Sequence, residues 1–196
     1  MAPVYKFSNA GGLTTRQQYT SMLAGNPATS PDAGAMFPLQ VVTIGAAGAS
    51  SVTFNNIPNT YAHLQIRAFT IGASDQYFTI RANSDTGSNY AYHQLAGDGA
   101  SASATSGAST STMFSGQGSQ SSSNGAVAIV DILDYANTNK NKVFRTLTGY
   151  DLNGAGGIWY RSGLWMNTNA INSLTLVNGA SFGQFSQLAL YGVKSA

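Results

Sequence analysis

The chain has 196 residues, a formal net charge of +2 and no cysteine, and only 8% of its residues are charged, against about 25% in an ordinary soluble domain. This length suits one domain, or one domain with a tail. The lack of cysteine excludes a disulfide framework and a thiolate zinc site, and the small charge argues against a nucleic-acid partner. Hydrophobic residues still make up 43% of the chain, which is enough for a core.

The first 38 residues predict an extended N-terminal arm with at most one short helix. Residues 14–24, TTRQQYTSMLA, place Tyr19, Met22 and Leu23 at helical spacing. The Pro-, Ala- and Gly-rich sequence that follows, residues 25–37, predicts a linker.

Targeting and membrane signals are weak in this sequence. The first ten residues lack the apolar run of a signal peptide. No stretch reaches the roughly 18 apolar residues of a membrane helix. We therefore expect a protein made in a bacterial cytoplasm, without a membrane partner.

From residue 39 the hydrophobic pattern has a period of two. Leu64, Ile66 and Ala68, for example, alternate with polar residues, as in a half-buried strand. The predicted strands are 39–44, 51–54, 61–70, 77–82, 90–95, 126–133, 143–149, 157–165, 171–177 and 187–193. Because no helix separates them, residues 39–196 predict an all-β domain, an antiparallel β-sandwich of jelly-roll type.

Residues 97–125 interrupt this pattern. They are almost all Gly, Ala, Ser and Thr, with Met113 and Phe114 as the large apolar residues. The composition fits a long loop or flat strands with small side chains. We expect a Gly/Ser-rich loop, although a loop of this length is uncommon in a compact domain.

The titratable residues predict no catalytic or metal site. His63 and His93 lie on predicted strands among polar neighbours, which favours a structural or surface role. Asp85 and Asp151 resemble the start of a calcium loop, but the sequence has no Glu to complete one. Asx-turns are the favoured interpretation of both. We therefore expect no metal, no cofactor and no enzymatic activity.

The remaining charged residues are scattered along the predicted strands. Asp131 and Asp134 are three residues apart, so on a strand they point to opposite faces and cannot act as a carboxylate pair. Four arginines are isolated on strands, where we expect them to pair with Asp or with a partner chain: Arg67, Arg81, Arg145 and Arg161.

Trp159, Tyr160 and Trp165 fall close together in the segment GIWYRSGLW. Aromatic side chains of this kind belong in a sandwich core or at a subunit interface. They can also stack on sugar rings near strand ends. Both alternatives remain open from the sequence, and the core and interface interpretation is favoured.

Six segments are distinctive when taken together: 5–27 (YKFSNAGGLTTRQQYTSMLAGNP), 51–67, 81–99, 130–142 (VDILDYANTNKNK), 163–176 and 188–194. Through them the chain resembles virion structural proteins of tailed bacteriophages, marine and cyanobacterial phages in particular, of the head decoration and fibre type. The resemblance implies a non-enzymatic component of the virion. It does not distinguish head, fibre and tail.

The first functional expectation is a capsid decoration or cement protein, assembled into the virion in the host cytoplasm. The arm would attach to the major capsid protein or another virion protein, and the β-domain would form a homo-oligomer, expected to be a trimer. The expected anchoring residues are Tyr5, Phe7, Arg16, Tyr19, Met22 and Leu23.

The alternative is a tail or head fibre module that binds a host receptor. In it Trp159, Tyr160, Trp165 and the Ser-rich segment would contact host surface glycan. A third possibility, a glycan depolymerase, is disfavoured because the seven Asp residues are scattered along the chain.

Overall fold

The computed structural model describes residues 35–72, 77–117 and 124–194. The chain divides into one unit that ends at Phe37 and a second unit, residues 38–195. The predicted helix at 14–24 and the six expected anchoring residues of the arm lie outside the described residues.

The described residues form strands and no helix, which confirms the predicted all-β class. It follows that they contain no helix long and apolar enough to cross a membrane. The twelve strands are β1 (Met36–Thr43), β2 (Ala49–Phe54), β3 (His63–Thr70), β4 (Tyr77–Ala82), β5 (Tyr90–Gly97), β6 (Ala102–Thr110), β7 (Met113–Gln117), β8 (Ala126–Leu133), β9 (Lys142–Asp151), β10 (Gly156–Trp165), β11 (Leu174–Phe182) and β12 (Gln187–Val193).

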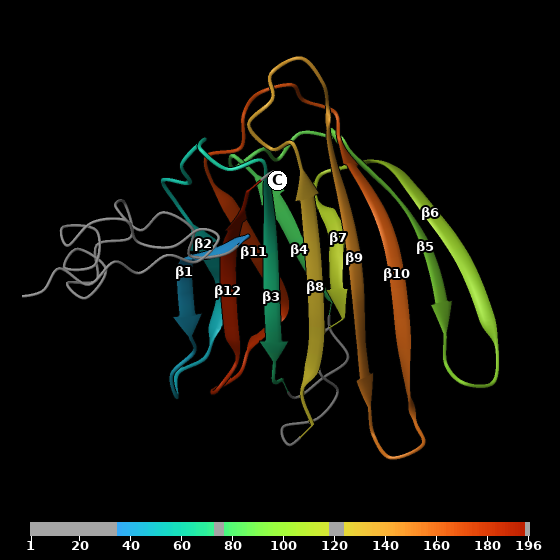
Figure 1. Ribbon diagram of the computed structural model, residues 1–196. Helices are drawn as coiled ribbons and strands as arrows, with labels where there is room; N and C mark the ends of the chain where they lie inside the picture. The colour runs from blue at the N-terminus through green and yellow to red at the C-terminus, as the bar shows by residue number, and fades with distance from the viewer. Residues whose placement is uncertain (1–34, 73–76, 118–123, 195–196) are drawn as a thin grey trace, which may run out of the picture. The chain divides into compact units, whose positions relative to one another are not determined.

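The strands form two stacked antiparallel sheets (Figure 1). The larger sheet has the order β1-β12-β3-β8-β9-β10-β5-β6 and the smaller one the order β2-β11-β4-β7. When the hairpins β5–β6 and β9–β10 are set aside, each sheet has four strands. Their order is β1-β12-β3-β8 in the larger sheet and β2-β11-β4-β7 in the smaller sheet. Successive strands or strand pairs then alternate between the sheets, as in a jelly roll. The predicted sandwich is therefore confirmed.

The two additional hairpins widen only the larger sheet. β9 pairs with β8, β10 with β9, and β5 with β10, so that β6 becomes the outermost strand. β7 packs against β8, β9, β10 and β5 but has no comparable contact with β6. In Figure 1 the β5–β6 hairpin accordingly extends beyond the smaller sheet. The wide sheet and the narrow sheet therefore cover each other only in part.

The core lies between the sheets, where the alternation predicted from the sequence is seen in the burial. Leu64, Ile66 and Ala68 of β3 are buried, and Phe78 of β4 packs against Phe182 of β11 with ring centroids 6.1 Å apart. Gly163 of β10 allows β7 to come close, since a Cβ at this position would lie 2.1 Å from the sulfur of Met113.

The loop expected at 97–125 is largely strand. β6 pairs with β5 from Ala102 to Gly107, and β7 pairs with β4. Met113 and Ser115 of β7 are buried, whereas most residues of β6 are exposed on both faces. The small side chains of β6 bury little apolar surface, so its backbone pairing leaves no alternating pattern in the sequence. The second alternative, flat strands with small side chains, describes this segment correctly.

Candidate functional site

The outer face of the larger sheet, which is turned away from the smaller sheet, is unusually apolar. Antiparallel sheets commonly present polar residues to solvent on this side. Here large hydrophobic side chains occupy the outward positions of five neighbouring strands, and they are 40–58% exposed. We call this set the apolar face: Phe69, Leu95, Val127, Ile129, Leu133, Val143, Leu147, Ile158 and Tyr160.

The strand register arranges these side chains in rows across the sheet. One row runs Ile129, Leu147, Tyr160, Leu95, through β8, β9, β10 and β5. Seven of these side chains, all except Leu133 and Val143, are contiguous across the five strands, and because each is about half exposed they present on the order of 600 Å² of surface, the upper end for the largest apolar patch of a typical monomer. The apolar face therefore has the size of a binding surface.

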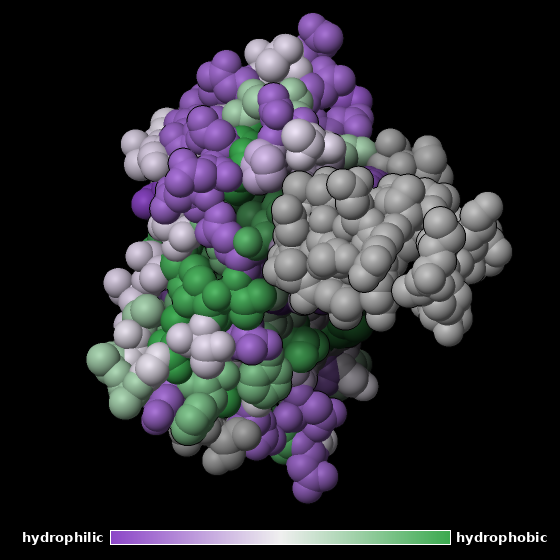
Figure 2. Space-filling model, turned by 60° about the vertical axis from the view of Figure 1, so that its left-hand side comes forward, coloured by the Kyte–Doolittle hydropathy of each residue, from purple (hydrophilic) through white to green (hydrophobic). Residues whose placement is uncertain are grey.

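Hydrophobic surface also appears elsewhere on the molecule. On the side shown in Figure 2, hydrophobic residues gather in a band across the middle, and hydrophilic residues dominate above it. Val41, Tyr77, Met166 and Phe185 are further large hydrophobic residues that are more than 40% exposed. The low charge of the sequence thus corresponds to a surface on which apolar and small polar groups are common.

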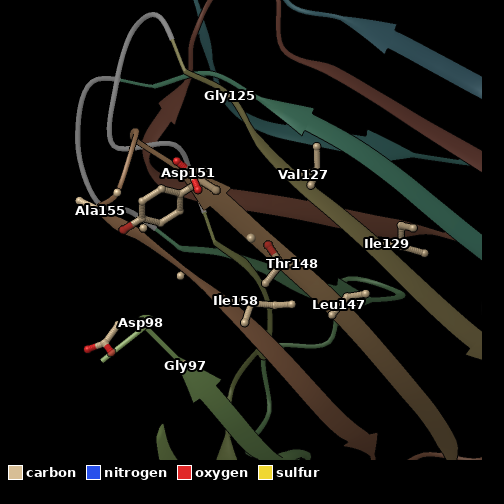
Figure 3. A pocket seen from close by; sticks show the side chains of 16 residues that line it. Gly97, Asp98, Gly125, Val127, Ile129, Leu147, Thr148, Asp151, Ala155 and Ile158 are labelled. Carbon is tan, nitrogen blue, oxygen red and sulfur yellow. The ribbon is translucent and has the colours of Figure 1, made fainter. Parts of the chain in front are cut away.

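A groove of about 700 Å³ crosses one end of the apolar face. It forms in the row that runs Gly149, Ile158, Gly97 through β9, β10 and β5. The two glycines have no side chain, so space is left on both sides of Ile158. Figure 3 shows the hydrophobic side chains of Val127 and Leu147 toward one end of the groove. The groove is therefore apolar over most of its length.

Two carboxylates, Asp98 and Asp151, lie at the other end of the groove (Figure 3). Asp98 Oδ1 accepts hydrogen bonds from the backbone N–H of Ser101 at 2.7 Å and of Ala100 at 2.9 Å, and these bonds lower the pKa of Asp98. Asp151 Oδ1 accepts from the N–H of Asn153 at 2.6 Å. Both carboxylates thus hold tight turns while lining the groove.

The Asx-turns predicted from the sequence are confirmed. Asp151 accepts from the residue two positions on, and Asp85 Oδ1 does the same with the N–H of Gly87 at 2.8 Å. Among the residues that the structure describes, no group of three His or Asp side chains could hold a metal ion.

A polar row crosses the outer face and separates Leu133 and Val143 from the other residues of the apolar face. Arg67 Nε donates to Gln65 Oε1, and Gln65 Nε2 donates to Asp131 Oδ1, both at 2.8 Å. The Arg67 guanidinium also lies 5.7 Å from the ring centroid of Tyr191. Arg145 is directly opposite Asp131 in the register of β8 and β9. Arg67, Gln65 and Asp131 thus form a hydrogen-bonded chain on the sheet surface.

Asp134 lies beyond the end of β8, separate from Asp131. Its carboxylate pairs with Lys140, which lowers the pKa of Asp134, and its backbone N–H donates to His63 Nδ1 at 3.0 Å. His63 therefore has the structural role favoured by the sequence. His93 is exposed on β5, opposite Ser162 of β10.

The three aromatic residues proposed as an interface or glycan site do not share one surface. Tyr160 belongs to the apolar face, whereas Trp159 points to the other side of β10 and stacks on Tyr150, with centroids 5.6 Å apart. Trp165 is 1% exposed and donates its indole N–H to Asp85 Oδ2 at 2.7 Å. Trp165 is a core residue and is not available to a sugar or a partner.

Arg161 lies on the inner side of β10 and is also 1% exposed. Its guanidinium stacks 4.5 Å from the ring centroid of Phe114, and its Nε donates to Gln94 Oε1 at 2.7 Å. Nη1 and Nη2 are buried and have no hydrogen-bond partner among the residues that the structure describes. Burial lowers the pKa of Arg161 to about 10, although the nearby Tyr77 and Tyr92 act in the opposite direction. Of the two partners expected from the sequence, an Asp or a partner chain, no Asp of the described residues pairs with Arg161.

Sequence reasoning missed the apolar face, since it assigned one buried side to each strand. The available signal was the run of hydrophobic residues at successive positions in β8, AVAIVDIL, where both faces are apolar.

Comparison with protein-family models, with curated proteins and with solved structures finds no match to this chain.

Proposed function

We propose that this protein is a non-enzymatic structural component of a phage virion, a capsid decoration or cement protein. The observation that carries the proposal is the apolar face. A protein that works as a free monomer rarely keeps so much contiguous apolar surface in water. Covering it would stabilise an assembly at roughly 25 cal/mol for each Å² of apolar surface buried.

The fold supports this proposal by analogy. Jelly-roll sandwiches occur in viral capsid proteins and in lectins. Fold alone does not establish function. The resemblance of the sequence to virion structural proteins points in the same direction, as does the scarcity of charged residues.

In this proposal the two parts of the chain have different partners. The arm, residues 1–38, attaches to the major capsid protein or another virion protein through Tyr19, Met22, Leu23 and the other anchoring residues. The β-domain forms a homo-oligomer, which we expect to be a trimer. Several arms held on one oligomer would bind together far more tightly than a single arm.

A binding assay with assembled heads of the major capsid protein encoded in the same genome tests the proposal. The full-length variant with Tyr19→Ser, Met22→Ser and Leu23→Ser should lose attachment to heads, because it removes the apolar anchors. Ser51→Asp, on an exposed position of the smaller sheet, is the matched control and should bind like the wild type. Equal binding by the triple variant would exclude attachment through the arm.

The second candidate is a fibre module that binds host glycan, and one observation favours it. Tyr150 and Asp151 line the groove, and Trp159, which does not line it, stacks on Tyr150 and supports that ring. An aromatic pair beside a carboxylate is a suitable platform for a sugar ring. Binding of the full-length chain to a glycan array, lost in Trp159→Ala and retained in Tyr160→Ala, would favour this function. Attachment to heads with no glycan binding would exclude it.

A further inference from the structure

The outer edge of β6 has the properties of an unprotected pairing edge. β6 is the last strand of the larger sheet, and no strand within the described residues pairs with its far side. Its residues 102–106 are exposed on both faces. Alternate residues of such a strand direct their backbone N–H and C=O groups outward, where they can pair with another chain.

Natural sheets usually protect an edge by keeping it short or by placing proline, a charged residue or a bulge on it. The other three edge strands follow this rule. β1 carries Pro38, β2 has six residues, and β7 has five residues with an irregular register beside Phe78. β6 has nine residues, ASATSGAST, with neither proline nor charge. Its register with β5 shifts between Tyr90 and Tyr92, opposite residues 107–110, so residues 102–106 form a regular stretch without a bulge.

We propose that β6 pairs in antiparallel orientation with β6 of a second copy of this chain. The contact joins the larger sheets of two copies into one continuous sheet. It is a two-fold contact, separate both from the arm and from the contact that would form the expected trimer, and it does not depend on the location of the protein in a virion.

The chemistry of β6 favours a second copy as the partner. An uncharged strand offers no charge complementarity to a basic or acidic peptide, and two such strands meet without repulsion between like charges. The side chains on both faces are Ala, Ser, Thr and Gly, so two strands can approach without steric conflict. β6 itself is held by a single neighbouring strand and buries little surface, and a second ladder would stabilise it.

The symmetry of this contact fixes its geometry. The two-fold axis is perpendicular to the sheet, so both copies present the apolar face on the same side. In an antiparallel pair, two residues that face each other across the contact have their side chains on the same face of the sheet. With this two-fold symmetry, one residue of β6 must therefore lie directly opposite the same residue of the second copy. Its Cβ atoms would be about 4.5–5.5 Å apart. Each residue next to this central one lies about 6.6 Å along the strand from the same residue in the second copy.

Cysteine scanning of the full-length chain tests this geometry, because the wild type has no cysteine. Single cysteines are introduced at positions 102–106 under mild oxidation, with Ser51→Cys on the smaller sheet and Ser162→Cys on the outer face of β10 as controls. Gly107 is left out because a Cβ there would lie 2.5 Å from the ring of Tyr92. Circular dichroism and melting temperature verify that each variant is folded.

We expect cross-linked dimers at one position of β6, at least five-fold above its neighbours and both controls. Ala104→Lys with Ser106→Lys should weaken self-association of the uncrosslinked chain at least ten-fold by sedimentation, whereas Ser51→Lys should not. The proposal would be overturned if no position of β6 cross-linked more than Ser51→Cys does. It would also be overturned if all five positions of β6 cross-linked equally. Failure to bind heads with the β6 cross-link intact would overturn only the proposed virion function.

Discussion

The indole N–H of Trp165 in β10 donates a hydrogen bond to Asp85 Oδ2 at 2.7 Å, across 80 residues of sequence. Asp85 belongs to the turn between β4 and β5, and the same oxygen accepts from Asn89 Nδ2 at 2.9 Å. The Trp165 ring also stacks on Tyr90, with centroids 6.4 Å apart. This contact joins the smaller sheet, through the β4–β5 turn, to the two added hairpins of the larger sheet.

Asp85→Ala should therefore destabilise the whole domain. It removes hydrogen bonds to a charged acceptor and leaves the buried indole N–H of Trp165 without its partner, which we expect to cost about 2–4 kcal/mol of unfolding free energy. Asp85→Asn retains one acceptor and should cost less. Urea denaturation measures both variants, and a loss below about 0.5 kcal/mol in Asp85→Ala would contradict the structural role of this carboxylate.

The stability of the protein in acid should also depend on Asp85. Burial acts to raise the pKa of Asp85, but hydrogen bonds from Trp165, Asn89 and Gly87 outweigh it and hold the pKa below its usual value. A lowered pKa in the folded state gives a contribution that is complete above the unfolded pKa, near 4, and is lost as the pH falls through the folded pKa. In thermal melts between pH 5 and pH 2, Asp85→Asn should show a shallower decline than the wild type.

Arg161→Met should leave the protein at least as stable as the wild type. The buried guanidinium lacks a described carboxylate partner, and well-packed hydrophobic replacements of buried charges are often neutral or stabilising by about 1–4 kcal/mol. Methionine can keep the contact with Phe114, whereas Arg161→Lys keeps the charge and loses the bond to Gln94. A loss of more than about 1 kcal/mol in Arg161→Met, measured by urea denaturation, would contradict this expectation.

Tyr90 and Arg161 should act in opposite directions at alkaline pH. Burial raises the pKa of Tyr90 to about 12, so its contribution is present below pH 10 and is lost as the pH rises toward 12. The pKa of Arg161 is lowered to about 10, so the cost of its buried charge is complete below pH 10 and declines as the pH rises above it. Tyr90→Phe should lose stability at pH 8, because its hydroxyl accepts from the N–H of Ala82 at 3.0 Å. The difference from the wild type should shrink between pH 10 and 12 and would remain constant if Tyr90 did not titrate there.

Substitutions on the apolar face should change association rather than folding. Leu147→Asp and Ile129→Asp replace side chains that are 48% and 41% exposed, so we expect small changes in unfolding free energy, within about 1 kcal/mol. Self-association or aggregation, measured by light scattering, should fall markedly. Val130→Asp, at the neighbouring buried position of β8, is the contrasting variant and should prevent folding. Unchanged scattering in the first two variants would show that this face is not a contact surface.

The sequence by itself determined the features that depend on local backbone preferences. Alternation in residues 61–70 identified β3, and the Asx-turns of Asp85 and Asp151 follow from hydrogen bonds that span two residues. The scarcity of helix-forming residues was enough for the all-β class. These properties are local, because a side chain and its nearest backbone groups decide them.

Only the tertiary structure decided which surfaces meet. β8 is apolar on both sides, so its sequence could not tell the core side from the exposed one. β6 has no apolar side at all, and only its pairing with β5 makes it a strand. The apolar face exists because eight strands join one sheet and four the other, and Trp165 meets Tyr90 and Asp85 only because the fold brings β10 beside β5 and the β4–β5 turn. Such outcomes depend on contacts between residues far apart in the chain, which leave no period in the sequence.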